Sequence, residues 1–123
     1  MISQSKTFNL NTSLLLESGA KLKNVSIAYE TFGELNKDRS NAILICHALT
    51  GNSHVCSSDE DSSEGWWEKS VGPNKAIDTN TYFVICSNVL GSCKGSTGPA
   101  SINPETNEAY GLSFPVFTAS SKG

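Results

Sequence analysis

Two short runs of apolar residues without any polar interruption stand out along the chain, at residues 42–46 (AILIC) and 82–86 (YFVIC). A continuous apolar run of this length between polar loops is typical of a strand that is buried on both faces, as in a parallel sheet. About 35 residues separate the two runs, which is enough for the crossover connection that parallel strands require. We therefore expect two neighbouring, parallel, buried strands.

The first part of the chain follows a different pattern. A short apolar run at residues 14–16 precedes Ser18 and Gly19, a pair typical of turns, and residues 25–31 then alternate between two sets of side chains. Alternation with a period of two is typical of a strand with one solvated face, and Glu30 belongs to the set assigned to solvent. The pattern predicts a β-hairpin over residues 13–31.

The pattern changes again after residue 89. Seven glycine and proline residues lie between Gly91 and Pro115, too many for a helix to form there. An antiparallel start, two buried parallel strands and no long helices make an incomplete set of elements for an α/β domain. We expect residues 1–123 to be a single incomplete domain, the front part of a larger α/β fold.

Composition and charge narrow the class of protein. Hydrophobic residues make up 37% of the chain and charged residues 17%, which favours a folded core over disorder. The net charge is −3 and the basic residues are scattered, so we expect no nucleic-acid partner. No apolar run approaches the ~20 residues that cross a bilayer, and the first eleven residues are polar, so we expect a cytoplasmic protein without a membrane segment.

The four cysteines, at positions 46, 56, 86 and 93, do not have the spacing of a metal site. No C-x-x-C pair occurs, and we therefore expect no metal. Cys46 and Cys86 end the two apolar runs, where a free cysteine behaves as a small buried hydrophobic residue. We expect both to be inert core thiols.

Residues 47–51 (HALTG) form the first stretch that could carry chemistry, directly after the first apolar run. In an open parallel sheet, ligands bind beyond the carboxyl ends of the strands. A turn of small residues there can direct backbone N–H groups at a developing oxyanion. The alternative is that His47 is a hydrogen-bonded core histidine and that the turn only connects two elements.

Residues 91–95 (GSCKG) match the spacing of a nucleophile elbow, with Cys93 as the nucleophile. An elbow continues into a helix, but Gly95, Gly98 and Pro99 follow at once, and both histidines precede Cys93 although the catalytic histidine of such enzymes follows the nucleophile. Residues 91–98 also lack the Lys-[Ser/Thr] pair and the helix of a phosphate-binding loop. Both interpretations are disfavoured.

Several longer stretches together resemble one family, the homoserine O-acetyltransferases. They are residues 29–33 (YETFG), 47–54 (HALTGNSH), 65–67 (GWW), 72–73 (GP), 77–79 (IDT), 82–91 (YFVICSNVLG) and 95–104 (GSTGPASINP). The resemblance runs from about residue 8 to residue 118 and corresponds to the amino-terminal third of the family's chain.

The resemblance implies an α/β-hydrolase fold and a ping-pong acyl transfer through a serine, from acetyl-CoA as co-substrate to L-homoserine, in methionine biosynthesis. It places the Leu49 backbone N–H in the oxyanion hole, after His47, which is not the catalytic histidine. It also implies that the substrate-binding stretch consists of Thr50, Gly51, Asn52, Ser53 and His54. No bound cofactor is expected, and the full-length protein is a possible homodimer.

The departures from the family leave alternatives open. The family's nucleophile, acid and base follow further along its chain, so we expect residues 1–123 alone to be inactive. Residues 119–123 (ASSKG) differ from the family's continuation, as expected of a fragment, a truncated gene or a frameshift. Related proteins transfer succinyl groups or acylate serine, and a non-catalytic remnant that binds a partner subunit is the alternative from another class.

Overall fold

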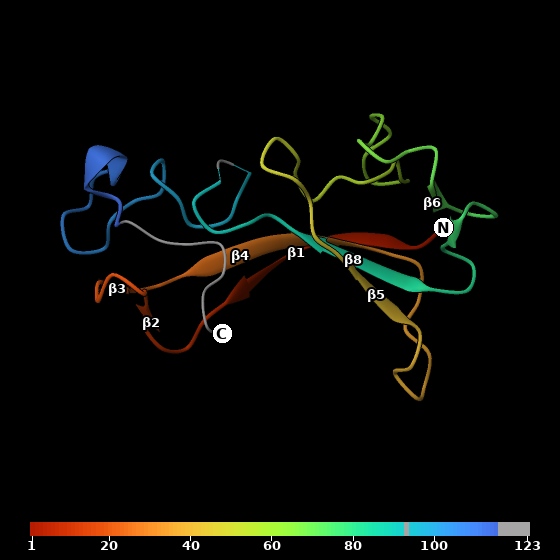
Figure 1. The fold of residues 1–123 in the computed structure, drawn as a ribbon, viewed down its shortest axis with the longest axis horizontal. Helices are drawn as coiled ribbons and strands as arrows, with labels where there is room; N and C mark the ends of the chain where they lie inside the picture. The colour runs from red at the N-terminus through yellow and green to blue at the C-terminus, as the bar shows by residue number, and fades with distance from the viewer. Residues whose placement is uncertain (93, 116–123) are drawn as a thin grey trace. The chain divides into compact units, whose positions relative to one another are not determined.

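The computed structural model describes residues 1–92 and 94–115. Their elements, in chain order, are β1 (Ser3–Asn9), β2 (Leu14–Leu15), β3 (Lys21–Leu22), β4 (Ser26–Phe32), β5 (Ala42–Ile45), β6 (Val71–Gly72), β7 (Ile77–Asp78), β8 (Phe83–Ser87) and the 3-10 turn η1 (Gly111–Ser113). One sheet has the strand order β1-β4-β8-β5, as Figure 1 shows, and β2 pairs with β3 and β6 with β7.

The chain divides into two compact units. The first contains Met1–Lys6 and Ala28–Asn88, and the second contains Thr7–Ile27 and the described residues from Val89 onward. The expected single domain over residues 1–123 stays a prediction. Among the described residues, no helix has the length and apolar character needed to cross a membrane.

Strand β8 organises the first unit. It pairs with β4 in antiparallel orientation and with β5 in parallel orientation, which confirms the expected parallel pair. Cys86 lies opposite Glu30 on one side and opposite Ile45 on the other. Because β4 runs against its neighbour, Tyr29 and Glu30 lie opposite Ser87 and Cys86, at the carboxyl end of β8.

The core of the first unit lies on one face of this sheet. Val84 and Cys86 from β8 are fully buried against residues of the long connection between β5 and β8. The core residues are Phe32, Ile45, Val55, Cys56, Val71, Val84 and Cys86. The connection covers the sheet without a helix: β6 and β7 pair in parallel, and residues 66–70 form turns.

The expectation that the first apolar run is buried on both faces is wrong for the described residues. The side chain of Leu44 is 66% exposed and Cys46 is exposed. In the sheet order β5 is an end strand, and alternate side chains of a strand point to opposite faces, so Ile45 reaches the core while Leu44 points away from it. Cys86, in the inner strand β8, is buried as predicted.

The second unit has a small core of its own. Leu14 lies opposite Leu22 in the β2–β3 pair, and Leu16, Leu22 and Val25 pack with Tyr110 and other partly buried residues. The hairpin predicted over residues 13–31 is therefore shorter than expected. The strand predicted at 25–31 is β4, which pairs with β8 instead of returning along residues 14–16. Strand β1 was not predicted, and Cys93 lies outside the described residues.

A pair of glycines with nearly the same backbone conformation tests how closely the chain before β8 approaches the residue that follows β4. Gly33 (φ +89°) and Gly19 (φ +88°) both adopt a conformation that disfavours side chains. A Cβ at Gly33 would collide with the carbonyl oxygen of Tyr82 and lie 2.7 Å from that of Thr79, whereas a Cβ at Gly19 would have no atom within 4 Å.

We expect Gly33→Ala to lower the unfolding free energy by about 3 kcal/mol or more, since a backbone collision adds to the dihedral strain. Gly19→Ala should cost only about 1–2 kcal/mol, the strain alone. Urea unfolding of the two variants beside the parent protein measures both values. Equal losses in the two variants would contradict the close approach of the Tyr82 carbonyl to Gly33.

Candidate functional site

The loop that follows β5 and the residue that follows β8 lie together at the carboxyl edge of the parallel pair. The loop contains residues 47–54, and Asn88 comes directly after Ser87, the last residue of β8. This edge is where ligands bind in open α/β sheets. It is the candidate site of the first unit.

A tight turn forms the tip of this loop. The Gly51 N–H donates to the carbonyl oxygen of Ala48 at 2.8 Å. A Cβ at Gly51 would lie 2.9 Å from the Cβ of His47, so a small residue is required there, as the sequence suggested. The Leu49 side chain is 98% exposed, and among the described residues none accepts a hydrogen bond from its N–H.

Ser53 anchors the far end of the loop to the sheet. Its N–H donates to Oδ1 of Asn88 at 2.8 Å, and Nδ2 of Asn88 donates to the Ser53 hydroxyl at 2.9 Å. The same hydroxyl donates to Oε2 of Glu30 at 2.5 Å. Ser53 and Asn88 are buried, so the polar groups of this anchor satisfy one another without water.

His54 binds the other carboxylate oxygen of Glu30. Its Nδ1 lies 2.9 Å from Oε1 of Glu30, and its Nε2 lies 2.8 Å from the carbonyl oxygen of Ser63. Carboxylate and carbonyl oxygens are acceptors, and the Ser63 hydroxyl, 3.2 Å from Nε2, donates its proton to Asp61 at 2.6 Å, so the contacts favour a proton on each ring nitrogen. The geometry therefore fits an imidazolium bound to a carboxylate.

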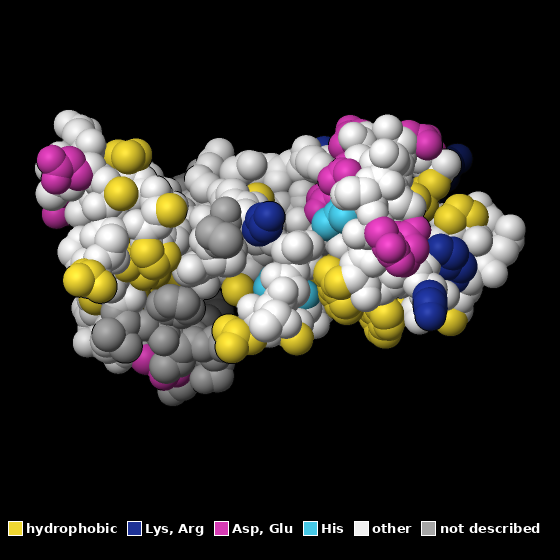
Figure 2. Space-filling model, turned by 90° about the horizontal axis from the view of Figure 1, so that it is seen from above, with side chains coloured by type: hydrophobic (Ala, Val, Ile, Leu, Met, Phe, Trp, Pro, Cys, Tyr) yellow, Lys and Arg dark blue, Asp and Glu magenta, His cyan; other side chains and the backbone are white. Residues whose placement is uncertain are grey.

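The electrostatic surroundings agree with this protonation. Partial burial acts to lower the pKa of His54, but the hydrogen bonds to Glu30 and Ser63 and the negative charges of Glu30 and Asp61 outweigh it. The pKa of His54 is therefore raised above its usual value. Figure 2 shows histidine and acidic side chains next to one another on this face, in keeping with Nδ1–oxygen distances of 2.9 Å to Glu30 and 3.8 Å to Asp61.

A second carboxylate holds the next loop. Glu68 accepts hydrogen bonds from the Ser57 N–H (2.7 Å), the Ser57 hydroxyl (2.5 Å) and the Gly65 N–H (2.9 Å). The Ser57 hydroxyl is the main cause that lowers the pKa of Glu68 to about 2, and the N–H groups and Lys75 add to it against the effect of desolvation. Glu68 closes residues 57–65 into a loop and has no contact with Glu30 or Ser53 among these bonds.

Trp66 links the two loops. Its Nε1–H donates to the carbonyl oxygen of Asn52 at 2.8 Å, and its ring stacks on that of Trp67 with centroids 5.5 Å apart. Both indoles remain partly exposed, at 43% and 40%. They therefore support the loop from its outer side rather than belong to the core.

The two buried cysteines, Cys56 and Cys86, do not fit a nucleophile. Burial raises the pKa of Cys56 and of Cys86 to about 11, so both are thiols near neutral pH. Cys93, the cysteine of the disfavoured elbow, lies outside the described residues. No group of three or more metal-ligating side chains occurs among residues 1–92 and 94–115.

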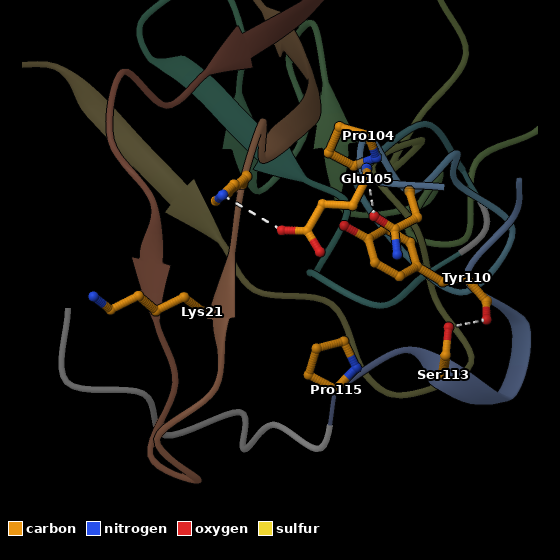
Figure 3. Close-up of a pocket in the computed structure, with 8 residues that line it drawn as sticks. Lys21, Pro104, Glu105, Tyr110, Ser113 and Pro115 are labelled. Carbon is orange, nitrogen blue, oxygen red and sulfur yellow. Dashed lines mark hydrogen bonds and ion pairs between the residues drawn. The ribbon is translucent and has the colours of Figure 1, made fainter. Parts of the chain in front are cut away.

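The second unit carries a shallow hollow, drawn in Figure 3, that has no comparable chemistry. One of its lysines, Lys23, is paired with Glu105 at 3.4 Å, and the Ser113 hydroxyl donates to the carbonyl oxygen of Tyr110 at 2.5 Å. These are surface interactions in an open depression, and they do not converge on a common point.

The structure brings some of the predicted site residues together and adds two that the sequence missed. Ser53 and His54 lie in one hydrogen-bonded cluster, whereas Leu49 and Thr50 are exposed at the tip. Asn88 was missed, although its place after a buried strand could have indicated it. Glu30 was assigned to a solvated face, which is wrong: its side chain is only 14% exposed, because residues 53 and 54 cover it.

No protein-family model matches the chain. A homoserine O-acetyltransferase of Methanosphaerula palustris is 64% identical over 118 residues, which cover 95% of this chain and 24% of that protein. The chain thus spans about a quarter of the length of the curated relatives that it matches.

Solved structures are similar to the chain as well. A homoserine O-acetyltransferase from Bacillus anthracis matches with a TM-score of 0.84 and 43% identity over 96% of this chain and 33% of its own. A crystal structure of an esterase matches with a TM-score of 0.82 and 37% identity over 95% of this chain and 34% of its own.

The mixed sheet, the loop after β5 and these matches define the amino-terminal part of an α/β-hydrolase fold. Within that fold, the chain is similar over nearly all of its length to the amino-terminal part of homoserine O-acetyltransferases, as its resemblance predicted.

The raised pKa of His54 has a consequence for stability. A group whose pKa is raised in the folded state adds stability that is fully present below its unfolded pKa, 6.5 here, and is lost as the pH rises through the folded pKa. We expect the difference in unfolding free energy between the parent protein and His54→Gln to be larger at about pH 6 than at about pH 9. Urea unfolding over this range measures it, and a difference that grows with pH would contradict the ion pair.

Proposed function

We propose that this segment supplies the oxyanion-stabilising loop of an enzyme that transfers the acetyl group of acetyl-CoA to the hydroxyl of L-homoserine. The observation that carries the proposal is the free, outward-facing tip at Leu49 on a loop that Ser53 and His54 tie to the sheet. Oxyanion donors must be fixed before charge develops, and an anchored backbone N–H meets that requirement. The names of the relatives support the same reaction.

In the proposed reaction, a serine of the whole enzyme attacks the thioester carbonyl of acetyl-CoA. The serine gives its proton to the catalytic base as it attacks. The carbonyl oxygen takes up negative charge, which the Leu49 N–H stabilises, and the thiol of CoA leaves with that proton. The homoserine hydroxyl then attacks the acyl-serine through a second oxyanion at the same place, its proton passes through the base to the serine oxygen, and the serine ester bond breaks. The serine, the acid and the base are expected outside this segment, as the family resemblance implies.

The remaining loop residues have a proposed role as well. Thr50 is exposed beside Leu49, and Gly51 and Asn52 are half-buried between the tip and the anchor. With Ser53 and His54, they would border the acyl group that the Leu49 N–H holds. Several further properties stay expectations from the resemblance. They are the use of acetyl rather than succinyl donors and of homoserine rather than serine, a cytoplasmic location, a role in methionine biosynthesis, the absence of a bound cofactor and a homodimer.

A second candidate function is ester hydrolysis. It rests on the esterase structure that is 37% identical to this chain over 95% of its length. The same oxyanion loop serves both reactions, since water replaces homoserine in the second attack. The acceptor therefore decides between the two functions.

The test uses a full-length chimaera in which the 118 matched residues of this chain replace their counterparts in the Methanosphaerula palustris relative. We expect release of the CoA thiol from acetyl-CoA that depends on L-homoserine, with O-acetylhomoserine as product. The unmodified relative and residues 1–123 alone are the controls. Thiol release at the same rate without homoserine would instead support hydrolysis, and a preference for succinyl-CoA would contradict the acetyl donor.

Two substitutions at Leu49 separate its main chain from its side chain. Leu49→Ala keeps the N–H and removes an exposed side chain, so kcat of the chimaera should change less than threefold or so. Leu49→Pro removes the N–H, and kcat should fall by roughly 10²–10³. Steady-state kinetics measure both, with circular dichroism as the check on folding. A loss of 10² or more in folded Leu49→Ala would contradict an oxyanion role of the main chain.

A further inference from the structure

The proposed mechanism leaves one well-placed charged group unused, the carboxylate of Glu30. It lies in the middle of β4 and its side chain is only 14% exposed, which is unusual for a glutamate. It does not face the tip of the loop. Its contacts are with Ser53 and His54, four and five residues beyond Leu49.

The sheet register fixes this placement. Glu30 lies opposite Cys86, and Cys86 lies opposite Ile45, so the three residues form one row across β4, β8 and β5. The loop of residues 47–54 begins two residues after Ile45 and therefore turns back over this row. The Glu30 carboxylate therefore lies within hydrogen-bond distance of Ser53 and His54, at the end of that loop.

Each oxygen of Glu30 binds a different residue of the loop. Oε2 accepts the Ser53 hydroxyl proton at 2.5 Å, and Oε1 accepts the Nδ1 proton of His54 at 2.9 Å. Asn88 binds both the N–H and the hydroxyl of Ser53, so the loop is bound both to β4 and to the residue that follows β8. Charge-assisted hydrogen bonds of this kind are about twice as strong as neutral ones.

We propose that Glu30 is a positioning residue for acyl transfer: its partly buried carboxylate clamps Ser53 and His54 and thereby fixes the loop whose tip presents the Leu49 N–H. The inference rests on the proposed function, in which that N–H is the oxyanion donor. A fixed donor is worth more than a mobile one, because a displacement of about 1 Å at a reacting site can cost about 10²-fold in rate.

Replacement by glutamine tests the charge with little change of shape. The amide offers one oxygen where the carboxylate offers two, and its NH₂ group faces a proton of Ser53 or of His54. One side of the clamp is thereby lost. In the chimaera, Glu30→Gln should lower kcat roughly 10- to 100-fold, while KM for homoserine changes much less.

Glu68→Gln is the matched control. Glu68 also accepts hydrogen bonds from two residues, Ser57 and Gly65, and it reaches the 49–54 loop only indirectly, through the Ser63 carbonyl that His54 binds. It should lower the melting temperature and leave kcat within about threefold of the parent chimaera. An equal loss of kcat in the two variants would show a general effect of stability and would overturn the proposal.

Two further measurements separate positioning from a merely structural role. Hydrogen exchange of the amides of residues 49–54 should become faster in folded Glu30→Gln and change much less in Glu68→Gln. The high-pH limit of kcat should move to lower pH in Glu30→Gln, because His54 loses its partner while Asp61 and the Ser63 carbonyl remain. If Glu30→Gln does not fold, His54→Gln, which leaves Glu30 bound to Ser53, should show the faster exchange.

The outcomes also distinguish this inference from the proposed function. No homoserine-dependent thiol release from the parent chimaera would contradict the function, whereas the exchange experiment would still report on the clamp. Unchanged exchange of residues 49–54 together with kcat within twofold of the parent in Glu30→Gln would overturn the clamp, whatever the reaction.

Discussion

The antiparallel pairing of β4 with β8 is the constraint on which the rest of the site depends. Had β4 run parallel to its neighbour, Glu30 would point toward a different part of the sheet. Because it runs against β8, Tyr29 and Glu30 lie opposite Ser87 and Cys86, near the carboxyl end of the β5–β8 pair, where the loop of residues 47–54 leaves the sheet. A short, mixed sheet thus brings a partly buried carboxylate to a loop that follows it in the chain.

The loops that carry the site are held by charged groups as well as by the hydrophobic core. Residues 48–65 are rich in serine, glycine, asparagine and aspartate, and only Val55 and Cys56 among them belong to the core. Glu30 and Glu68 each accept hydrogen bonds from two residues of these loops, and such bonds to charged groups contribute about 1.5–3 kcal/mol each. Two carboxylates therefore add to the stabilisation that the two apolar side chains provide.

The sequence predicted those parts of the structure whose signals are local. The runs at 42–46 and 82–86 indicated β5, β8 and their parallel pairing, and the small residues after β5 indicated the turn at the tip. Strand β1 was missed because its polar residues form a strand only by pairing with β4, an interaction without a local signal. The burial of Leu44 and Cys46 was predicted wrongly, because an apolar run does not show on which strand of the sheet it lies.

Within the candidate site, the sequence predicted the loop but not Glu30 and Asn88, the residues that bind it. Residues 49–54 were found through their position and their family resemblance. Glu30 is 24 residues from His54 along the chain, and its alternating neighbours favoured a solvated position. Glu30 becomes partly buried only because of the register of three strands and because residues 53 and 54 cover its side chain. A local sequence pattern shows neither.

The protonation of His54 tests the clamp most directly, since a protonated imidazole donates to the Glu30 carboxylate through Nδ1 and to the Ser63 carbonyl through Nε2. Nitrogen-15 NMR of the imidazole in the full-length chimaera follows both nitrogens through a pH titration. We expect the doubly protonated form to be lost at a lower pH when Glu30 is replaced by glutamine than in the parent chimaera. Loss of that form at the same pH in the two proteins would contradict the clamp.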